Sequence, residues 1–348
     1  MRRRRIWCET VSTGERGELG APATVALLRR FAITPIMAVW PHTAQAAGPV
    51  CARYAGEGLP VAVWPMLADA DGRWVSAGAG NLRAFSSFVE RLCDELGPGE
   101  IVLDLEPPIE AVRSSLASHA LRARMLPPGA DPASFRAARE GIAALAARLH
   151  ARGIAVSAAI APPILLDPLD PLDPLDPLDP NPGPWQERLG TPVDGIPWDH
   201  VSPMLYTSII EGWSRGLLDR ADARAILAAT CRASAARFRD RAGASLGAVG
   251  TGAFGDEPTY RDVAELADDV AIARAAGLDD LALFELGGVL RRPPAEAWLT
   301  AFVGTPPAAR LPEATLRARA ALAAARLAGG AFAALGRARR SFTAYDAS

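Results

Sequence analysis

The sequence contains no lysine. All 37 basic residues of the 348-residue chain are arginines. Schiff-base catalysis, a covalent pyridoxal phosphate site and a phosphate-binding loop of the Walker A type each need a lysine, so the sequence excludes all three. We expect the protein to work without a cofactor.

Cysteine and histidine are also scarce. The 4 cysteines lie far apart with no CxxC spacing, which indicates neither a disulfide-stabilised scaffold nor a zinc knuckle. The 4 histidines form no HxH or HExxH motif, so the usual histidine-rich metallohydrolase sites are excluded. We expect no metal at the site, and only a Mg²⁺ or Ca²⁺ site made of carboxylates stays open.

The charge is nearly balanced, and long apolar runs are absent. The formal charge is −2, whereas proteins that bind phosphate backbones usually carry a basic excess, so nucleic acid is not expected as the main partner. No run reaches the roughly 18 apolar residues of a membrane span. Arginines follow the initial methionine, but the apolar segment of a signal peptide does not. The expected location is cytoplasmic, unless the start of the gene is misassigned. The oligomeric state stays open.

The chain has the material and the pattern for an α/β fold. Half of its residues are hydrophobic, enough for a sizeable core. Short apolar runs alternate with longer segments of helical spacing. Eight such units predict a (β/α)₈ barrel of the TIM type over residues 1–305. A doubly wound sheet is the competitor, but no glycine-rich fingerprint follows the first strand. The predicted strands are Arg5–Thr10, Ile33–Trp40, Leu59–Leu67, Glu100–Glu106, Ile154–Ala161, His200–Thr207, Ser245–Gly252 and Asp280–Leu286.

Two segments fall outside the regular units. Five Leu-Asp-Pro triplets span Leu166–Pro180, in a loop expected over residues 162–197. Proline at every third position forbids a regular helix, so this loop is either an extended spacer or a wall of the cleft. Residues 306–348 are rich in alanine and arginine, and predict a C-terminal helical tail interrupted at Gly329 and Gly330.

Two carboxylates end the fourth predicted strand. Side chains alternate along a strand, so Asp104 and Glu106 share one face. Carboxylates on an apolar strand are costly unless they are hydrogen-bonded or open into a polar cleft. In a cleft, burial and a like-charged neighbour raise a carboxyl pKa, which suits Glu106 as a general acid with Asp104 as its helper. The alternative is a pair of buried acids bound to arginines or backbone amides.

Other candidates lie at the ends of the later strands. Met204 and Tyr206 share a face of the sixth strand, and a tyrosine there can donate a hydrogen bond to a substrate oxygen. On the eighth strand, the alternation leaves open whether Phe284 or Glu285 faces inward. We interpret all four residues as part of one site, with Tyr206 in a catalytic supporting role and the others in substrate binding.

Residues at the first three strands complete the predicted site. Glu9 ends the first strand, which neighbours the eighth in a closed barrel. Paired with Glu106, either Glu9 or Glu285 would make a two-carboxylate glycosidase, retaining if the carboxyl groups lie about 5–5.5 Å apart. Trp40 and Trp64 present flat faces that suit the C–H groups of sugars. Further tryptophans are Trp74, Trp185, Trp198 and Trp213.

Three motifs together resemble the chitinase-type glycoside hydrolases of family 18. They are Asp-x-Glu on the fourth strand, Met-x-Tyr on the sixth, and Phe-Glu-Leu-Gly-Gly on the eighth. The resemblance implies a (β/α)₈ barrel in which Glu106 is the acid/base, Asp104 orients the acetamide of the substrate and Tyr206 supports the same group. It also implies substrate-assisted hydrolysis, with the N-acetyl oxygen as internal nucleophile.

The sequence departs from the family at four positions. Gly99 and Val102 stand where the family has the first two aspartates of its strand-4 motif. Phe284 replaces a tryptophan, and Thr207 stands where the family usually has Asp or Asn. We predict a glycoside hydrolase acting on an oligosaccharide or glycoconjugate. The alternatives are a non-catalytic carbohydrate-binding barrel and a carboxylate–magnesium enzyme, such as a lyase or phosphodiesterase.

Overall fold

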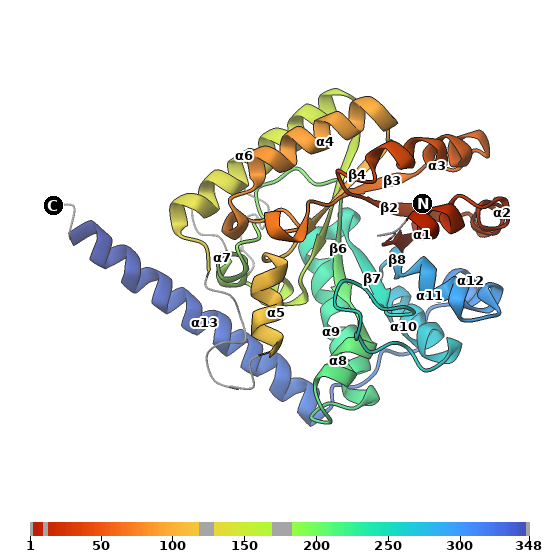
Figure 1. Ribbon diagram of the computed structural model, residues 1–348. Coiled ribbons are helices and arrows are strands. Elements are labelled where there is room, and N and C mark those ends of the chain that lie inside the picture. Colours follow the sequence, from red (N-terminus) through yellow and green to blue (C-terminus); the bar gives the residue numbers. More distant parts are fainter. Residues whose placement is uncertain (1–2, 10–12, 118–128, 169–182, 346–348) are drawn as a thin grey trace.

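The computed structural model describes residues 3–9, 13–117, 129–168 and 183–345. Within them, eight parallel strands pair in sequence order, and β8 pairs with β1 to close the barrel (Figure 1). The predicted (β/α)₈ fold is therefore confirmed. The strands are β1 (Arg3–Cys8), β2 (Thr34–Val39), β3 (Ala62–Pro65), β4 (Glu100–Leu105), β5 (Ala155–Ile160), β6 (His200–Leu205), β7 (Gly243–Gly247) and β8 (Asp280–Phe284).

Helices surround the barrel and connect its strands. The α-helices in the described part of the chain are α1 (Thr13–Leu19), α2 (Pro22–Phe31), α3 (Ala44–Gly56), α4 (Leu82–Leu96), α5 (Ile109–Ala117), α6 (Pro132–Ala151), α7 (Pro184–Leu189), α8 (Thr207–Trp213), α9 (Arg220–Phe238), α10 (Val263–Ala275), α11 (Leu286–Arg291), α12 (Ala295–Gly304) and α13 (Leu316–Tyr345). Short 3₁₀ turns precede α4, follow α9 and, as η3 (Pro162–Leu166), follow β5.

Helix starts follow local capping chemistry. Helix α10 begins at Val263 because the Asp262 carboxylate accepts hydrogen bonds from the backbone amides of Ala264 and Glu265, at 2.9 and 3.1 Å. A start at Thr259, which the sequence pattern suggests, is therefore wrong by one helical turn. The extra residues belong to the loop between β7 and α10.

The core has two layers. One lies between the strands and the surrounding helices, and the other fills the barrel itself. The inner layer is rich in aromatic side chains that are at most 8% exposed, namely Trp7, Trp40, Trp64, Trp74 and Phe284. Since a barrel of eight strands has just enough interior to be filled by side chains, these rings form the floor on which a site at its mouth must rest.

Ion pairs close the amino-terminal end of the barrel. The Arg5 guanidinium lies between Glu100 and Asp280, at 3.0 and 2.8 Å. Arg3 also contacts Glu100, at 2.6 Å, and the Ser157 hydroxyl donates to the same carboxylate. Burial alone would raise the pKa of Glu100, but Arg5 and Arg3 hold it below its usual value. These acids are therefore structural.

The segment that follows β5 is anchored at both of its described ends. The Asp167 carboxylate accepts hydrogen bonds from the backbone amides of Trp185, at 2.7 Å, and Gln186, at 3.3 Å. Most of the Leu-Asp-Pro repeat, at residues 169–182, lies outside the described residues. The aspartate of the first triplet thus ties the start of the repeat to the residues that follow it.

Helix α13 packs on α7, α9 and η3, and its later turns extend away from the barrel (Figure 1). The predicted interruption at Gly329 and Gly330 is wrong, because the helix continues through both glycines. A Cβ atom at Gly329 would lie 2.9 Å from Nε1 of Trp185, and that indole donates to the Ala325 carbonyl at 3.2 Å. The glycine therefore permits close packing. Among the described helices, none has the length and apolarity that a membrane crossing needs.

Candidate active site

A cavity of about 250 Å³ lies at the carboxyl-terminal end of the barrel. Such sites are built from strand ends and the loops that follow them. Seven of the nine residues singled out from the sequence line it, namely Glu9, Trp64, Asp104, Glu106, Met204, Tyr206 and Phe284. The fourth, sixth and eighth strands therefore bring their motifs to one place.

Trp40 and Glu285 do not line this cavity. Trp40 is 3% exposed and belongs to the aromatic layer inside the barrel. The Glu285 carboxylate caps α11 by accepting hydrogen bonds from the backbone amides of Gly287 and Gly288, at 2.7 and 2.6 Å. Of the two inward candidates on the eighth strand, Phe284 is thus the one at the cavity.

Several lining residues were not predicted as site residues. Trp74 and Trp213 line the cavity, whereas Trp185 and Trp198 do not. Phe254 and Glu257 also line it, and both lie in the loop between β7 and α10. The sequence pattern suggested a strand continuing to Gly252, but β7 ends at Gly247, so this loop was longer than expected.

The Asp104 and Glu106 carboxyls occupy an environment that disfavours charge. Asp104 is 4% exposed, and its Oδ1 has no hydrogen-bond partner among the described residues. Burial, together with the negative charges of Glu106 and Glu9, raises the pKa of Asp104 well above its usual value. Burial raises the pKa of Glu106 to about 7, against the opposing charge of Arg73. Glu106 is thus poised to give and take a proton near neutral pH.

Arg73 is the cation nearest this group of acids, and sequence reasoning missed it. Its guanidinium contacts Glu9 at 2.9 Å and Asp69 at 2.8 Å, and Arg113 contacts the other oxygen of Asp69, also at 2.8 Å. The backbone of Arg73 has a φ of 60°, a conformation that non-glycine residues rarely adopt. Such a turn in the loop after β3 leaves no motif in the sequence.

Tyr206 packs against the floor of the cavity. Its ring stacks on that of Phe284, with centroids 5.2 Å apart and planes inclined by 29°. Burial and the charge of Asp104 raise the pKa of the Tyr206 phenol well above its usual value. The hydroxyl therefore stays protonated at all physiological pH values and can donate a hydrogen bond to a substrate oxygen.

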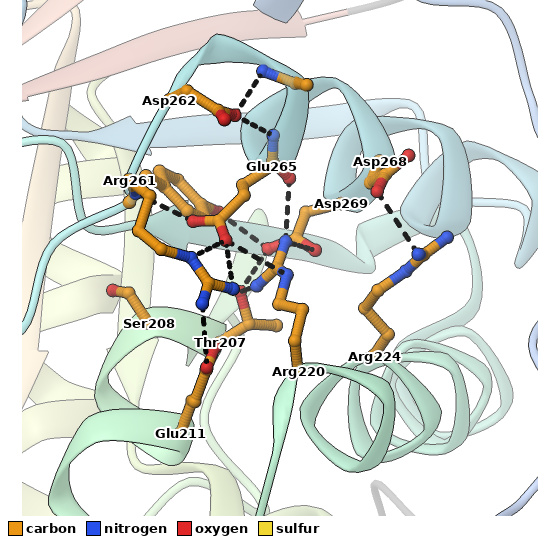
Figure 2. Close-up of polar contacts among 12 residues, drawn as sticks. Thr207, Ser208, Glu211, Arg220, Arg224, Arg261, Asp262, Glu265, Asp268 and Asp269 are labelled. Carbon is orange, nitrogen blue, oxygen red and sulfur yellow. Dashed lines mark hydrogen bonds and ion pairs between the residues drawn. The ribbon is translucent and has the colours of Figure 1, made fainter.

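A buried polar network fixes the chain immediately after Tyr206 (Figure 2). Thr207 is fully buried and its hydroxyl donates to Asp269, which is also fully buried. The Asp269 carboxylate further accepts from Arg220 and from the Tyr260 hydroxyl, each at 2.8 Å. Thr207 thus begins α8 by bonding toward α10 and is not among the residues lining the cavity. This contact explains what the residue does where the chitinase-type motif has Asp or Asn.

Some buried polar atoms in the wall of the cavity lack a hydrogen-bond partner among the described residues. Nε1 of Trp74 and Oε2 of Glu257 make no hydrogen bond to any described residue, whereas the Trp64 indole interacts with the Asp104 carboxyl. All four side chains line the cavity. An unpaired buried polar group costs about 1–3 kcal/mol, so these atoms favour a ligand that offers both donors and acceptors. Hydroxyl groups offer both.

The described residues hold no group of three or more His, Cys, Asp and Glu side chains placed to bind a metal ion. The acids of the cavity are instead spread over its wall, with Glu9 bound to an arginine. The carboxylate–magnesium alternative therefore lacks a donor set in this part of the chain.

Comparison with known proteins adds a fold likeness. No protein-family model matches the chain, and no curated protein does. The glycoside hydrolase domain of PgaB (BpsB) from Bordetella bronchiseptica matches 87% of this chain and 99% of its own, at 12% identity and a TM-score of 0.52. A class V chitinase from Pseudomonas fluorescens matches 87% of this chain and 98% of its own, at 14% identity and a TM-score of 0.51.

A sugar phosphate isomerase/epimerase from Parabacteroides distasonis is also similar, at 12% identity and a TM-score of 0.44, over 86% of this chain and 92% of its own. At such identities these likenesses concern the fold alone. The chain thus bears a remote resemblance in fold to chitinase-type barrels, and the chemistry of its site has to be argued from its own residues.

Proposed function

We propose that the protein is a glycoside hydrolase that acts on an oligosaccharide or a glycoconjugate. The main support for this proposal is the position of Glu106, whose carboxyl lies in the cavity at the barrel mouth and has a pKa of about 7. A carboxyl of this kind can protonate the glycosidic oxygen as it leaves and then activate the incoming water.

Asp104 and Tyr206 support this acid. Burial and the neighbouring negative charges raise the pKa of Asp104 well above its usual value, which favours the neutral carboxyl, a form that can donate a hydrogen bond. Tyr206 offers a second donor from the end of β6. Both can hold substrate oxygens while Glu106 transfers its proton, since neither competes with Glu106 as a negative charge.

The aromatic wall favours a carbohydrate as ligand. Trp64, Trp74 and Phe284 give the cavity flat apolar surfaces, which pack against the C–H faces of a sugar ring. The unpartnered indole N–H group of Trp74 would donate to one of its hydroxyl oxygens. Aromatic faces and polar edges in one small cavity are the combination that a pyranose needs.

Turnover of a panel of aryl glycosides, with and without a 2-acetamido group, tests the proposal. We expect hydrolysis by the wild type and a loss of more than about a hundredfold in Glu106→Gln. The matched control is Glu140→Gln on the exposed face of α6, which should keep the wild-type rate. Equal rates in wild type and Glu106→Gln would remove Glu106 from the mechanism.

Two other outcomes would replace the proposal. Sugar binding that is equal in wild type and Glu106→Gln, without turnover of any glycoside, would identify a non-catalytic carbohydrate-binding barrel. Turnover that is abolished by a chelator and restored by Mg²⁺ would identify a metal-dependent enzyme.

A further inference from the structure

Glu257 is a buried acid that forms no ion pair with any described residue. It is 6% exposed and lies in the loop between β7 and α10. Its Oε1 accepts a hydrogen bond from the backbone amide of Phe254 at 2.9 Å, while Oε2 is buried without a partner among the described residues. By contrast, Glu9 and Glu285 each contact an arginine. A buried carboxylate with an unused oxygen is costly, so it is expected where a ligand supplies the missing donor.

Packing on α8 fixes the loop that carries Glu257. A Cβ atom at Gly212 of α8 would lie only 2.3 Å from Cγ of Pro258, so the loop rests directly on the helix backbone. The Phe254 ring meets the ring of Trp213 edge to face, with centroids 5.9 Å apart. Both of these rings line the cavity together with Glu257. The position of the carboxylate is therefore set before any ligand binds.

The cavity that Glu257 lines is acidic. Its other titratable side chains come from the ends of β1, β4 and β6, and are Glu9, Asp104, Glu106 and Tyr206. No arginine or histidine is among its described lining residues, since Arg73 contacts Glu9 from the neighbouring cavity. On α8, Glu211 is paired with Arg261 at 3.4 Å.

The charge of Glu257 acts on the acids across the cavity. Burial raises the pKa of Glu9 to about 8 and that of Glu106 to about 7, and the negative charge of Glu257 contributes to both shifts. Burial and the surrounding carboxylates, Glu257 included, also raise the pKa of the Tyr206 phenol. Because such an effect weakens with distance, the Glu257 carboxylate faces the same space as these groups.

The ligand group that meets Glu257 has to be a hydrogen-bond donor. An ionised carboxylate only accepts hydrogen bonds, and Oε2 has no other donor among the described residues. A donor without an acceptor is supplied by Nε1 of Trp74, in the loop after β3. Strands β3 and β7 lie opposite one another in the ring of the barrel. A sugar between these loops would donate from one hydroxyl to Glu257 and accept at another from Trp74.

We propose that Glu257 is a specificity-determining residue, whose Oε2 accepts a hydrogen bond from one hydroxyl group of the sugar bound beside Glu106. The inference rests on the proposed hydrolase function, which places a sugar in this cavity. The substrate is then a glycoside that carries this hydroxyl, and one that lacks it leaves Oε2 buried and unpaired. Rejection of an analogue in this way is stronger than a simple loss of contact, because the cost of the unpaired group remains.

Monodeoxy forms of an aryl glycoside that the wild type hydrolyses test the contact. Each form lacks one hydroxyl group of the ring, and kcat/KM is measured for the wild type and for Glu257→Gln. This variant keeps an oxygen for the Phe254 amide and loses the charge. Dividing the two values for each glycoside cancels its intrinsic reactivity. We expect the variant to be slower by about tenfold to a hundredfold on the parent glycoside, and nearly equal to the wild type on the form that lacks the donor hydroxyl.

Two results would overturn the inference while the proposed function stands. One is a loss by the same factor on every member of the panel, and the other is no loss on the parent glycoside. Either result would mean that Glu257 binds no hydroxyl group of the substrate.

Binding of the same panel covers the case in which the wild type hydrolyses no glycoside, an outcome that would remove the proposed function. The fluorescence of the tryptophans in the cavity reports Kd for the wild type and for Glu257→Gln. The parent should bind the variant at least about tenfold more weakly, and one deoxy form should bind both proteins equally. Equal Kd values for the parent, or no binding of any member, would overturn the inference as well.

The pH profile tests whether the charge of Glu257 lies in the cavity, with Asp256→Asn as the matched control. Asp256 precedes Glu257 in the same loop but is exposed. Loss of the Glu257 charge should lower the pKa values of Glu9 and Glu106 alike, so the basic limb of kcat/KM should move to lower pH by about one unit in Glu257→Gln. Asp256→Asn should keep the wild-type limb and the wild-type ratios over the panel. A Glu257→Gln protein with a lower melting temperature and an unmoved limb would contradict the proposal, because a merely structural role predicts that pair of results.

Discussion

Strand β4 carries acids at both of its ends, and their pKa values are shifted in opposite directions. At the amino-terminal end, Glu100 is bound by two arginines and a serine, and its pKa is below the usual value. Near the carboxyl-terminal end, Asp104 has an unpartnered oxygen and a pKa well above the usual value. The two residues are both less than 7% exposed, so burial alone does not decide the outcome. The arginines that bind Glu100 decide the direction of its pKa shift.

This difference separates stability from function. A buried carboxylate that is fully paired holds strands together, while one that is left unpaired costs free energy and persists where a ligand or a reaction uses it. In a barrel the two roles occupy opposite ends of the same strands. Matched substitutions at the two ends of β4 should therefore change the free energy of unfolding in opposite directions.

Isosteric amides at Glu100 and Asp104 give the largest expected effect. Glu100→Gln takes one of its two carboxylate partners from the buried Arg5 guanidinium and should lower the free energy of unfolding by about 3 kcal/mol. Asp104→Asn removes a carboxyl whose charged form is disfavoured by burial in the native state, so it should raise that free energy. Urea unfolding at pH 7 measures both. A loss of stability in Asp104→Asn would contradict the comparison.

The pH dependence of stability gives the next largest effect. Folded Glu106 has a pKa of about 7 and its unfolded value is about 4.5, so between these pH values only the native state binds the proton. The wild type should therefore lose about 2–3 kcal/mol relative to Glu106→Gln as the pH rises from 4.5 to 7, and almost nothing further above about pH 8. The contribution of Glu100 runs the other way, since it is present above pH 4.5 and disappears on acidification. Thermal unfolding of both proteins across this pH range measures the difference in stability. A difference that does not change with pH would contradict the pKa assigned to Glu106.

The smallest effect concerns the serine at the amino-terminal end. Ser157→Ala removes the hydroxyl that donates to Glu100 and should cost about 1 kcal/mol. Its counterpart at the mouth is Tyr206→Phe, which removes the hydroxyl proposed to hold a substrate oxygen and should cost activity instead of stability. Denaturant midpoints and reaction rates of both variants test this prediction. A loss of stability in Tyr206→Phe together with a loss of activity in Ser157→Ala would contradict it.

The barrel could be predicted because its signal is repeated eight times. Each strand shows an apolar run of the right length, and an error at one end of a strand, such as the overextension to Gly252, leaves the order of elements intact. The continuous helix through Gly329 could not be predicted, because the glycine makes room for the side chain of Trp185, which lies 144 positions earlier. Long-range packing leaves no local pattern.

The site was predictable where strand alternation governs it. Strand alternation placed Asp104 and Glu106 on one face of the fourth strand and Met204 and Tyr206 on one face of the sixth, and all four line the cavity. Arg73 and Glu257 could not be found in this way, because they come from irregular loops whose backbone course depends on contacts with other strands. These loop residues set the electrostatics of the cavity. The strand motifs could therefore be recognised in the sequence, whereas the balance of charges around the carboxyls could not.

The anchoring of Asp167 to the amides of Trp185 and Gln186 has an evolutionary consequence. Tandem nine-nucleotide units in a gene expand and contract by replication slippage, and here each unit would add or remove one Leu-Asp-Pro triplet. Because the flanks are clamped to one another, a change in copy number alters only the entropy of closing the loop, by a few tenths of a kcal/mol per triplet. Close homologues should therefore differ in their number of triplets while keeping the aspartate and the residues it clamps.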